Sequence, residues 1–269
     1  MFIGHHGVAF AAKAAAPRAQ LGVLFLATMW LDLVWPVLLL FHVEVVRFVP
    51  GITRVNPFDF VFYPYSHSLL FAVLWGVAFG GVYALIVRAW WPAAIAGLVV
   101  VSHWFLDLIV HRPDLALYPG GPKLGLGLWN YLAATVLLEL LIFAGGVFLY
   151  VRATRPKDRL GRWGLAAFIV FLLLLYGSSL VFPPPFNVRA LAFGALATLV
   201  LPLWAWWVDR HRLAHGVGQY RRNSPPTARN SDGLIRRWCA TRTEWSGPSS
   251  SRRQKARNRV STGKRGNRS

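Results

Sequence analysis

The feature that most constrains the fold of this chain is a series of apolar runs, each of about twenty residues. A helix rises about 1.5 Å per residue, so a run of this length matches the roughly 30 Å hydrocarbon core of a bilayer. A hydrophobic content of 55% with only 14% charged residues argues against a water-soluble domain of this size. We therefore predict an all-α fold, a polytopic membrane bundle of about six transmembrane helices. The predicted spans are 20–42, 67–87, 90–111, 126–151, 163–182 and 188–208.

Charge divides the chain into a predicted integral membrane domain at 1–209 and a basic tail at 210–269. The first part carries 13 Lys and Arg against 8 Asp and Glu, whereas the second carries 16 against 2. Because the tail is rich in Ser, Gly, Asn and Pro, we expect it to be disordered. It is either a solvated extension or a polybasic segment that contacts anionic lipid headgroups, and its lack of an amphipathic period favours the first. No specific nucleic-acid binding is predicted.

Basic residues also set the predicted orientation in the lipid bilayer. Under the six-span threading, most Lys and Arg outside the tail fall in loops on one side, with the densest cluster at 152–162. The opposite loops, 43–66 and 112–125, hold only two basic residues each. The positive-inside rule then puts both termini in the cytoplasm.

Ionisable side chains interrupt several of the apolar runs. They are Asp32, His67, His103 and Asp107. A charged side chain at the centre of a bilayer costs about 2.5–3.5 kcal/mol on insertion scales, so it seldom lies there without a role. His103, Asp107 and His111 are spaced by four residues, which puts them on one face of a helix. His and carboxylate side chains are typical zinc ligands, and the single Cys239 excludes a Cys-based zinc site.

Depth in the membrane decides whether these residues can meet. At about 1.5 Å per residue, Asp32 and His103 both lie roughly 12 Å below the outer surface. Asp107 is one turn shallower, His67 begins the second span, and His111 lies at the boundary, so we predict a metal site in the outward half. Each residue alone has a simpler interpretation. His103 and Asp107 could form an intrahelical pair, His67 could be interfacial, and Asp32 could be a protonated acid.

Two N-terminal histidines and one deep carboxylate fit this site less directly. The segment before Pro17 is too short to span a bilayer. It puts His5 and His6 near the inner surface, unless the segment is re-entrant. Glu139 lies roughly 20 Å from the outer face. It is either a partner of the site or a separate structural bond.

At these residues the chain resembles the family of membrane-bound metal-dependent hydrolases, which includes inner-membrane-associated members. The matching pieces are Gly4-His5, Asp32, His67 after Ser66, Ser102-His103 with Asp107 four residues later, and the segment GLGLWN before the fourth span. The resemblance covers roughly 1–212 and leaves the tail out. The family is distantly similar to zinc-dependent phospholipase C and P1-type nucleases, helical enzymes whose metal ions are held by scattered His and Asp residues.

The resemblance implies that the chain binds a divalent metal, with Zn²⁺ the expected ion. The implied ligands are His5, Asp32, His67, His103 and Asp107. The chain departs from the family in two places. Many relatives carry Pro-Asp-x-Asp-His in place of the lone Asp32, and His-Arg-Gly-x-Thr-His-Ser where this chain has FYPYSHS.

Three classes of function remain open, led by a metal-dependent hydrolase that cleaves a phosphoester or another ester. In that class Asp32 or Asp107 orients or deprotonates a water molecule. The depth of the site favours a lipid-linked substrate. Arg112 or Lys123 could bind its anionic headgroup, unless both only snorkel to the interface.

The second class is a proton- or ion-coupled transporter with Asp32, Asp107 and Glu139 as a relay. Against it, we expect few interrupted helices and find no internal repeat. The third class is a non-catalytic membrane scaffold, which would leave the buried Asp and His residues without a purpose.

Overall fold

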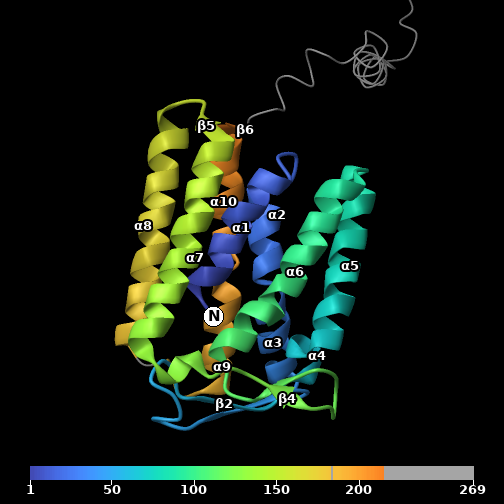
Figure 1. Ribbon diagram of the computed structural model, residues 1–269, viewed down its shortest axis with the longest axis vertical. Helices are drawn as coiled ribbons and strands as arrows, with labels where there is room; N and C mark the ends of the chain where they lie inside the picture. Colours follow the sequence, from blue (N-terminus) through green and yellow to red (C-terminus); the bar gives the residue numbers. More distant parts are fainter. Residues whose placement is uncertain (183, 215–269) are drawn as a thin grey trace, which may run out of the picture. The chain divides into compact units, whose positions relative to one another are not determined.

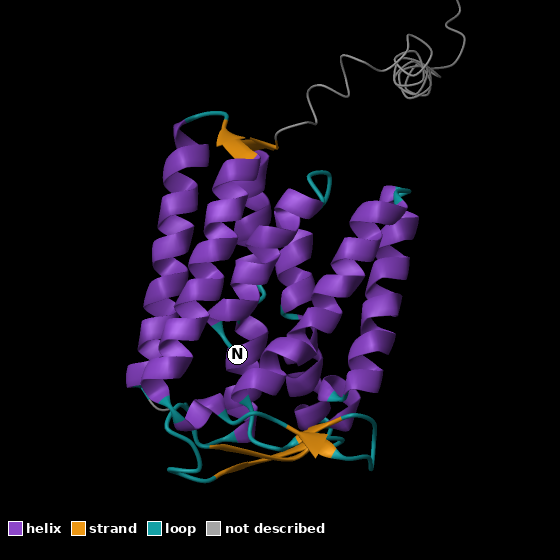
Figure 2. Ribbon diagram, viewed as in Figure 1, coloured by secondary structure: helices purple, strands orange, loops and turns teal. Residues whose placement is uncertain are grey.

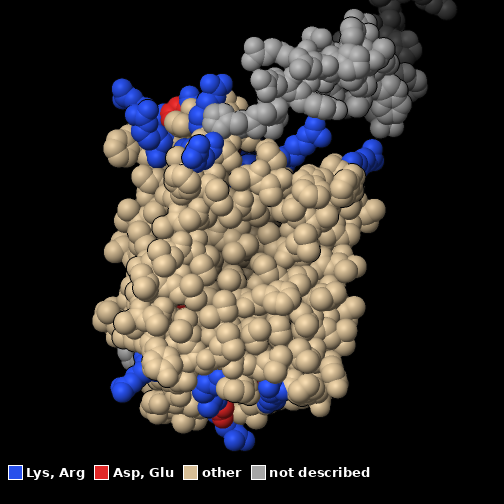
Figure 3. Space-filling model, viewed as in Figure 1, with Lys and Arg blue, Asp and Glu red and all other residues tan. Residues whose placement is uncertain are grey.

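The computed structural model describes residues 1–182 and 184–214, which form a bundle of membrane helices (Figure 1). Five spans are long and apolar enough to cross a bilayer within this part of the chain, and a bent helix pair makes a sixth. The five are α5 (Leu69–Val87), α6 (Trp90–Val110), α7 (Leu132–Ala153), α8 (Arg159–Val181), and α9 (Val188–Ala197) continued by α10 (Val200–Arg210). A wide belt without visible Lys or Arg separates basic side chains at the two ends (Figure 3). The predicted all-α polytopic membrane fold is confirmed.

The first predicted span, 20–42, is broken into α2 (Leu21–Thr28) and α3 (Trp30–Leu40), which meet at an angle of 50°. At the break the Thr28 hydroxyl donates to the carbonyl of Phe25 at 2.8 Å. The carbonyl of Thr28 faces α6 at the break and accepts a hydrogen bond there from His103.

Helix α1 (Ile3–Ala15) is buried in the bundle and starts near its mid-height (Figure 1). Its 13 residues extend only about 20 Å, too short to cross the bilayer. Glu139 of α7 caps its N-terminus, because Oε2 accepts hydrogen bonds from Phe2 N at 2.8 Å and Gly4 N at 3.1 Å. A deep carboxylate in α7 thus caps the N-terminus of α1, a helix more than a hundred residues earlier in the sequence.

Glycines allow the closest helix contacts. A Cβ atom on Gly7 of α1 would lie 2.6 Å from the carbonyl oxygen of Ile142, and one on Gly146 of α7 would collide with the Gly7 carbonyl. Helices α5 and α6 meet in the same way, since a Cβ on Gly76 would lie 2.8 Å from the Gly97 oxygen. Small residues at such positions let membrane helices approach backbone to backbone.

At the end where α1 turns into α2, an ion pair and a small sheet join distant segments. Lys13 Nζ lies 2.7 Å from Asp209 Oδ2 of α10. Strand β5 (Thr154–Pro156) pairs with β6 (Arg212–Ala214), and the buried Arg212 donates to Thr154 and Gly161. The ordered chain therefore continues past the predicted boundary at 209. The predicted disordered tail otherwise lies at 215–269, outside the described residues.

At the other end, short strands and turns cover the helices (Figure 2). They are β1 (Val45–Phe48), β2 (Phe58–Phe62), α4 (Pro64–His67), β3 (Leu115–Ala116), β4 (Lys123–Leu124) and the 3₁₀ turn η1 (Leu128–Asn130). We call this set the strand cap. Strands β1 and β2 are antiparallel, and so are β3 and β4. Phe60 of β2 packs on Trp35 of α3 and Trp129 of η1, with ring centroids 5.5 and 6.2 Å apart.

Candidate metal centre

Asp107 on α6 lies at the centre of a buried group of histidines. Its Oδ1 atom is 3.1 Å from His5 Nε2 of α1, and its Oδ2 atom is 3.1 Å from His103 Nε2, one turn earlier on α6. His67 Nε2 of α4 and His111 Nε2 lie 3.9 and 3.7 Å from the same Oδ2. The amino group of Met1 also contacts Oδ1. The spacing by four residues therefore acts as the sequence predicts, and it aligns His103, Asp107 and His111.

Asp32 on α3 supplies a second carboxylate on the opposite side of the histidines. Its Oδ1 atom is 3.5 Å from His67 Nε2 and 3.6 Å from His103 Nε2. Its side chain is 47% exposed, whereas those of His67, His103 and Asp107 are at most 5% exposed. Asp32 is therefore the group through which a ligand in the adjoining cavity can reach the centre.

Three of the histidines, His67, His103 and His111, are each oriented by a partner on the Nδ1 side. His103 Nδ1 lies 2.7 Å from the carbonyl of Thr28, which the α2–α3 break turns toward it. His67 Nδ1 lies 2.8 Å from Ser66 Oγ. His111 Nδ1 lies 2.9 Å from Asp114 Oδ1. Such a partner fixes the tautomer so that Nε2 carries the lone pair, and this is the usual arrangement of metal-binding histidines.

Two of these partners are themselves held by further polar groups. Ser66 Oγ donates to Glu44 Oε2 at 2.6 Å, while the other oxygen of Glu44 accepts from the backbone N–H groups of Tyr65 and Ser66, both at 2.8 Å. Tyr63 donates its hydroxyl to Asp114 at 2.8 Å. Burial raises the pKa of Glu44, although its bonds to Ser66 oppose the shift. Burial lowers the pKa of His111, although the hydrogen bond to Asp114 opposes the shift. The lowered pKa favours the neutral ring that a metal requires.

The geometry and the donor set both fit a metal ion. Two overlapping sets, His5–His103–Asp107 and Asp32–His67–His103, each offer three ligand atoms within 4.8 Å of one another. Ligand atoms of a tetrahedral zinc site with bonds of about 2.1 Å lie about 3.4 Å apart. The separations of 3.1 to 3.9 Å around Asp107 and Asp32 bracket that value. His103 Nε2 lies 3.1 Å from Asp107 Oδ2 but makes no hydrogen bond within the described residues, and with Nδ1 donating to Thr28 its lone pair is available to an ion.

The structure brings all five predicted ligands together, and it corrects the expected position of two histidines. His5 and His6 do not lie near the inner surface, because α1 is a buried helix that starts at mid-height among the long helices. The spacing of apolar residues gave no signal for this, and only the family resemblance placed His5 in the site. Glu139 has a structural role, because it forms the hydrogen bonds that cap α1. Its side chain also lines the cavity beside the centre.

Sequence reasoning missed the groups that orient the histidines. Asp114 follows His111 by three residues, a spacing that could have suggested their contact. Glu44 lies 22 residues before Ser66 in a loop, and no local pattern links the two. Of the predicted headgroup ligands, Arg112 pairs with Asp59 at 2.9 Å, and Lys123 donates to the Val61 carbonyl.

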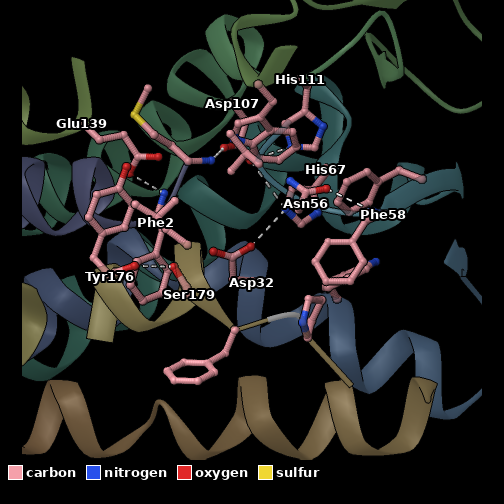
Figure 4. Close-up of a pocket in the computed structure, with 18 residues that line it drawn as sticks. Phe2, Asp32, Asn56, Phe58, His67, Asp107, His111, Glu139, Tyr176 and Ser179 are labelled. Carbon is pink, nitrogen blue, oxygen red and sulfur yellow. Dashed lines mark hydrogen bonds and ion pairs between the residues drawn. The ribbon is translucent and has the colours of Figure 1, made fainter. Parts of the chain in front are cut away.

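A cavity of about 320 Å³ opens onto the centre (Figure 4). Asp32, His67, Asp107 and His111 form its polar floor, and Glu139 lies to one side. Its walls are mainly aromatic and aliphatic. They include Trp35, Phe58, Phe60, Trp129, Tyr176 and Leu180.

A second cavity of about 170 Å³ lies against His5, His6 and Asp32. Met29 at the α2–α3 break and Thr198 at the α9–α10 break also line it. Both ring nitrogens of His6 are buried there without a hydrogen-bond partner. Asp32 lines both cavities and therefore separates them.

Comparison of the chain with protein-family models, with curated proteins and with solved structures gives no match. The geometry of the centre is therefore what indicates a function.

Proposed function

We propose that the chain is a membrane-embedded, metal-dependent hydrolase that cleaves a phosphoester or another ester of a lipid-linked substrate. The observation that supports this most is the convergence of four Nε2 atoms and two carboxylates from α1, α3, α4 and α6 and the segment after it. Because His103 donates its Nδ1 proton to the Thr28 carbonyl, its Nε2 lone pair faces the carboxylates of Asp107 and Asp32 at 3.1 and 3.6 Å, and a cation between these groups would satisfy all three. We propose Zn²⁺ as the ion, because its ligands are typically imidazole and carboxylate.

Within this proposal the residues divide the work by their exposure. His5, His67, His103 and Asp107 are buried and would hold the ion. When bound, Zn²⁺ lowers the pKa of water to about 7 and polarises a phosphoryl or carbonyl oxygen. Asp32 is half-exposed toward the larger cavity, so its carboxylate can accept a proton from a water molecule that attacks a substrate there. Burial of Asp107 argues for a ligand role over a role as base.

We also propose an orientation, with both termini in the cytoplasm of a bacterial cell and the centre toward the outer leaflet of the inner membrane. The end opposite the strand cap carries the larger number of basic residues. They are Arg18, Arg88, Arg152, Arg155, Lys157, Arg159, Arg162, Arg210 and Arg212. Under the positive-inside rule this end is cytoplasmic.

One observation favours a second candidate, an ion- or proton-coupled carrier. Sequence reasoning expected few interrupted helices, but both α2–α3 and α9–α10 are broken beside the second cavity, where Asp32 lies. Broken helices at a buried site are common in carriers. The predicted relay loses one member, however, because Glu139 is engaged in capping α1.

Elemental analysis of protein purified without chelators tests the hydrolase proposal. We expect stoichiometric zinc in the wild type and loss of most of it in His103→Ala and Asp107→Ala. His211→Ala is the matched control, because His211 pairs with Asp158 at the other end of the molecule. A wild type without stoichiometric metal contradicts the proposal. Metal retained in both site variants moves the site elsewhere. Zinc-dependent hydrolysis of 4-nitrophenyl phosphate or 4-nitrophenyl acetate separates the enzyme from the carrier.

A further inference from the structure

The larger cavity combines a polar floor with an apolar wall. The floor consists of ionisable side chains at the candidate centre, and the wall consists of Trp35, Phe58, Tyr176 and Leu180. Small-molecule sites in general combine apolar walls with a few polar groups, so the position of the mouth decides which kind of ligand can enter. The split between floor and wall matches an amphiphile, with its polar group at the floor and its hydrocarbon part along the wall.

The mouth of the cavity lies at the end of α8. Ser179 and Phe182 line the cavity at this end of α8, and both are exposed. The surface around them is apolar, since Val181, Phe182 and Phe186 are 74%, 68% and 57% exposed. Exposed side chains of this kind at the end of a membrane helix are in contact with lipid. The cavity therefore opens toward the bilayer.

The strand cap closes the cavity on the side that leads to water. Phe60 packs over His111 with ring centroids 4.9 Å apart, and Trp129 lies 4.2 Å from the same ring. Phe48 of β1 contacts Phe186, at a ring-centroid distance of 5.7 Å, and so joins the cap to the segment after α8. A substrate dissolved in water would have to displace this aromatic layer, whereas a lipid can enter past Ser179 and Phe182.

We infer that the larger cavity binds the hydrocarbon chain of an amphiphilic ester, which enters sideways from the bilayer past the end of α8. The inference rests on the proposed hydrolase function and adds the place of the hydrocarbon chain and its access route. The polar ester group lies beside Asp32 and His67. The chain lies along Trp35, Tyr176 and Leu180 and leaves the protein between Ser179 and Phe182.

Binding of hexadecylphosphonate tests this inference, with methylphosphonate as the chainless comparison. The protein is held in phosphatidylcholine nanodiscs, and bound phosphonate is measured by native mass spectrometry. We expect Ser179→Trp to block the mouth and weaken hexadecylphosphonate binding by at least about tenfold, the effect of losing a large apolar contact. Ser179→Leu is the alternative if the Trp variant does not fold, and we expect it to weaken binding by a smaller factor.

Ser178→Trp is the matched control, because Ser178 is adjacent, makes the same hydroxyl bond to the preceding turn and does not line the cavity. Equal binding by the two Trp variants, or no preference for the long chain in the wild type, overturns the inference. Zinc content and 4-nitrophenyl ester hydrolysis are measured in parallel. A wild type that binds hexadecylphosphonate but has neither zinc nor ester hydrolysis would contradict the hydrolase proposal and still support the lipid site.

Discussion

At the scale of single residues, the centre depends on side chains that orient the metal-binding residues but would not contact the metal ion themselves. Ser66 illustrates this, because its hydroxyl accepts a hydrogen bond from His67 Nδ1 and donates one to Glu44. The arrangement extends the carboxylate's influence to the imidazole and makes His67 a better donor at Nε2. Burial of Glu44 strengthens these bonds, because no water competes with Ser66 for the carboxylate.

We predict that Ser66→Ala weakens zinc affinity by about 10- to 100-fold, the usual cost of losing a partner that orients a ligand histidine. Competition with a zinc chelator of known affinity measures the change. Ser102→Ala is the control, since Ser102 precedes ligand His103 but bonds only to the Val99 carbonyl within its own helix. If the two variants hold zinc equally well, then Ser66 does not act through His67.

Four of the five candidate ligands follow from the sequence by physical reasoning alone. Asp32, His103 and Asp107 were marked by the cost of an ionisable group in an apolar span, and His67 by its shared depth. His5 was not, because a histidine in a short N-terminal helix carries no information about depth. The groups around the ligands, such as Glu44, become visible only when the loops fold over the helices.

At the scale of elements, the centre depends on how closely α1 approaches α7. Gly7 and Gly146 face each other at the contact, and His5 lies half a turn from Gly7 on the same helix. A group that separates the two backbones therefore also displaces His5 relative to Asp107. The helix contact and the metal centre are therefore mechanically connected.

We predict that Gly146→Ala destabilises the protein by about 1–3 kcal/mol, the usual cost of overpacking, and lowers its zinc content. The new Cβ would meet the backbone carbonyl of Gly7, which cannot rotate out of the way. Gly145→Ala is a close control, because its Cβ would meet nothing within 4 Å. It should be neutral or stabilising by up to about 1 kcal/mol through helix propensity. Denaturation in detergent that ranks the two variants the other way contradicts the packing argument.

The positions of the long helices were predictable from hydropathy, but their internal breaks were not. The predicted span at 90–111 corresponds to α6 (Trp90–Val110), because apolar length alone fixes it. The α2–α3 break lies inside a continuous apolar run, so hydropathy averaged over the span gives no sign of it. Burial of α1 was equally hidden, since an apolar face looks the same toward protein as toward lipid.

At the scale of the whole molecule, the bundle is closed by one ion pair between distant segments. Lys13 at the end of α1 meets Asp209 near the end of α10, and their side chains are only 6% and 13% exposed. Asp209 also accepts hydrogen bonds from Leu21 N and the Tyr150 hydroxyl. A single carboxylate thus connects four helices, so its loss affects all of them.

We predict that Asp209→Leu destabilises the protein by about 3–5 kcal/mol, because it leaves the buried Lys13 ammonium without an opposite charge, bonded only to the Ala19 carbonyl among the described residues. The double variant Lys13→Met/Asp209→Leu should recover most of this loss, since replacing both charges with apolar groups avoids the unpaired ion. A double-mutant cycle by chemical denaturation measures the coupling. Additive losses would show that the pair contributes through packing alone.

The burial of α1 has a consequence for the order in which the protein assembles. This helix precedes the six described spans, yet its main partner, α7, begins at Leu132 and its ionic partner, Asp209, follows much later. Contacts between segments so distant in sequence form late and slowly. His5 can settle beside Asp107 only after the helices that enclose α1 have entered the membrane. Maturation of the centre is thus coupled to completion of the bundle, and a nascent chain cannot trap a metal in its final geometry.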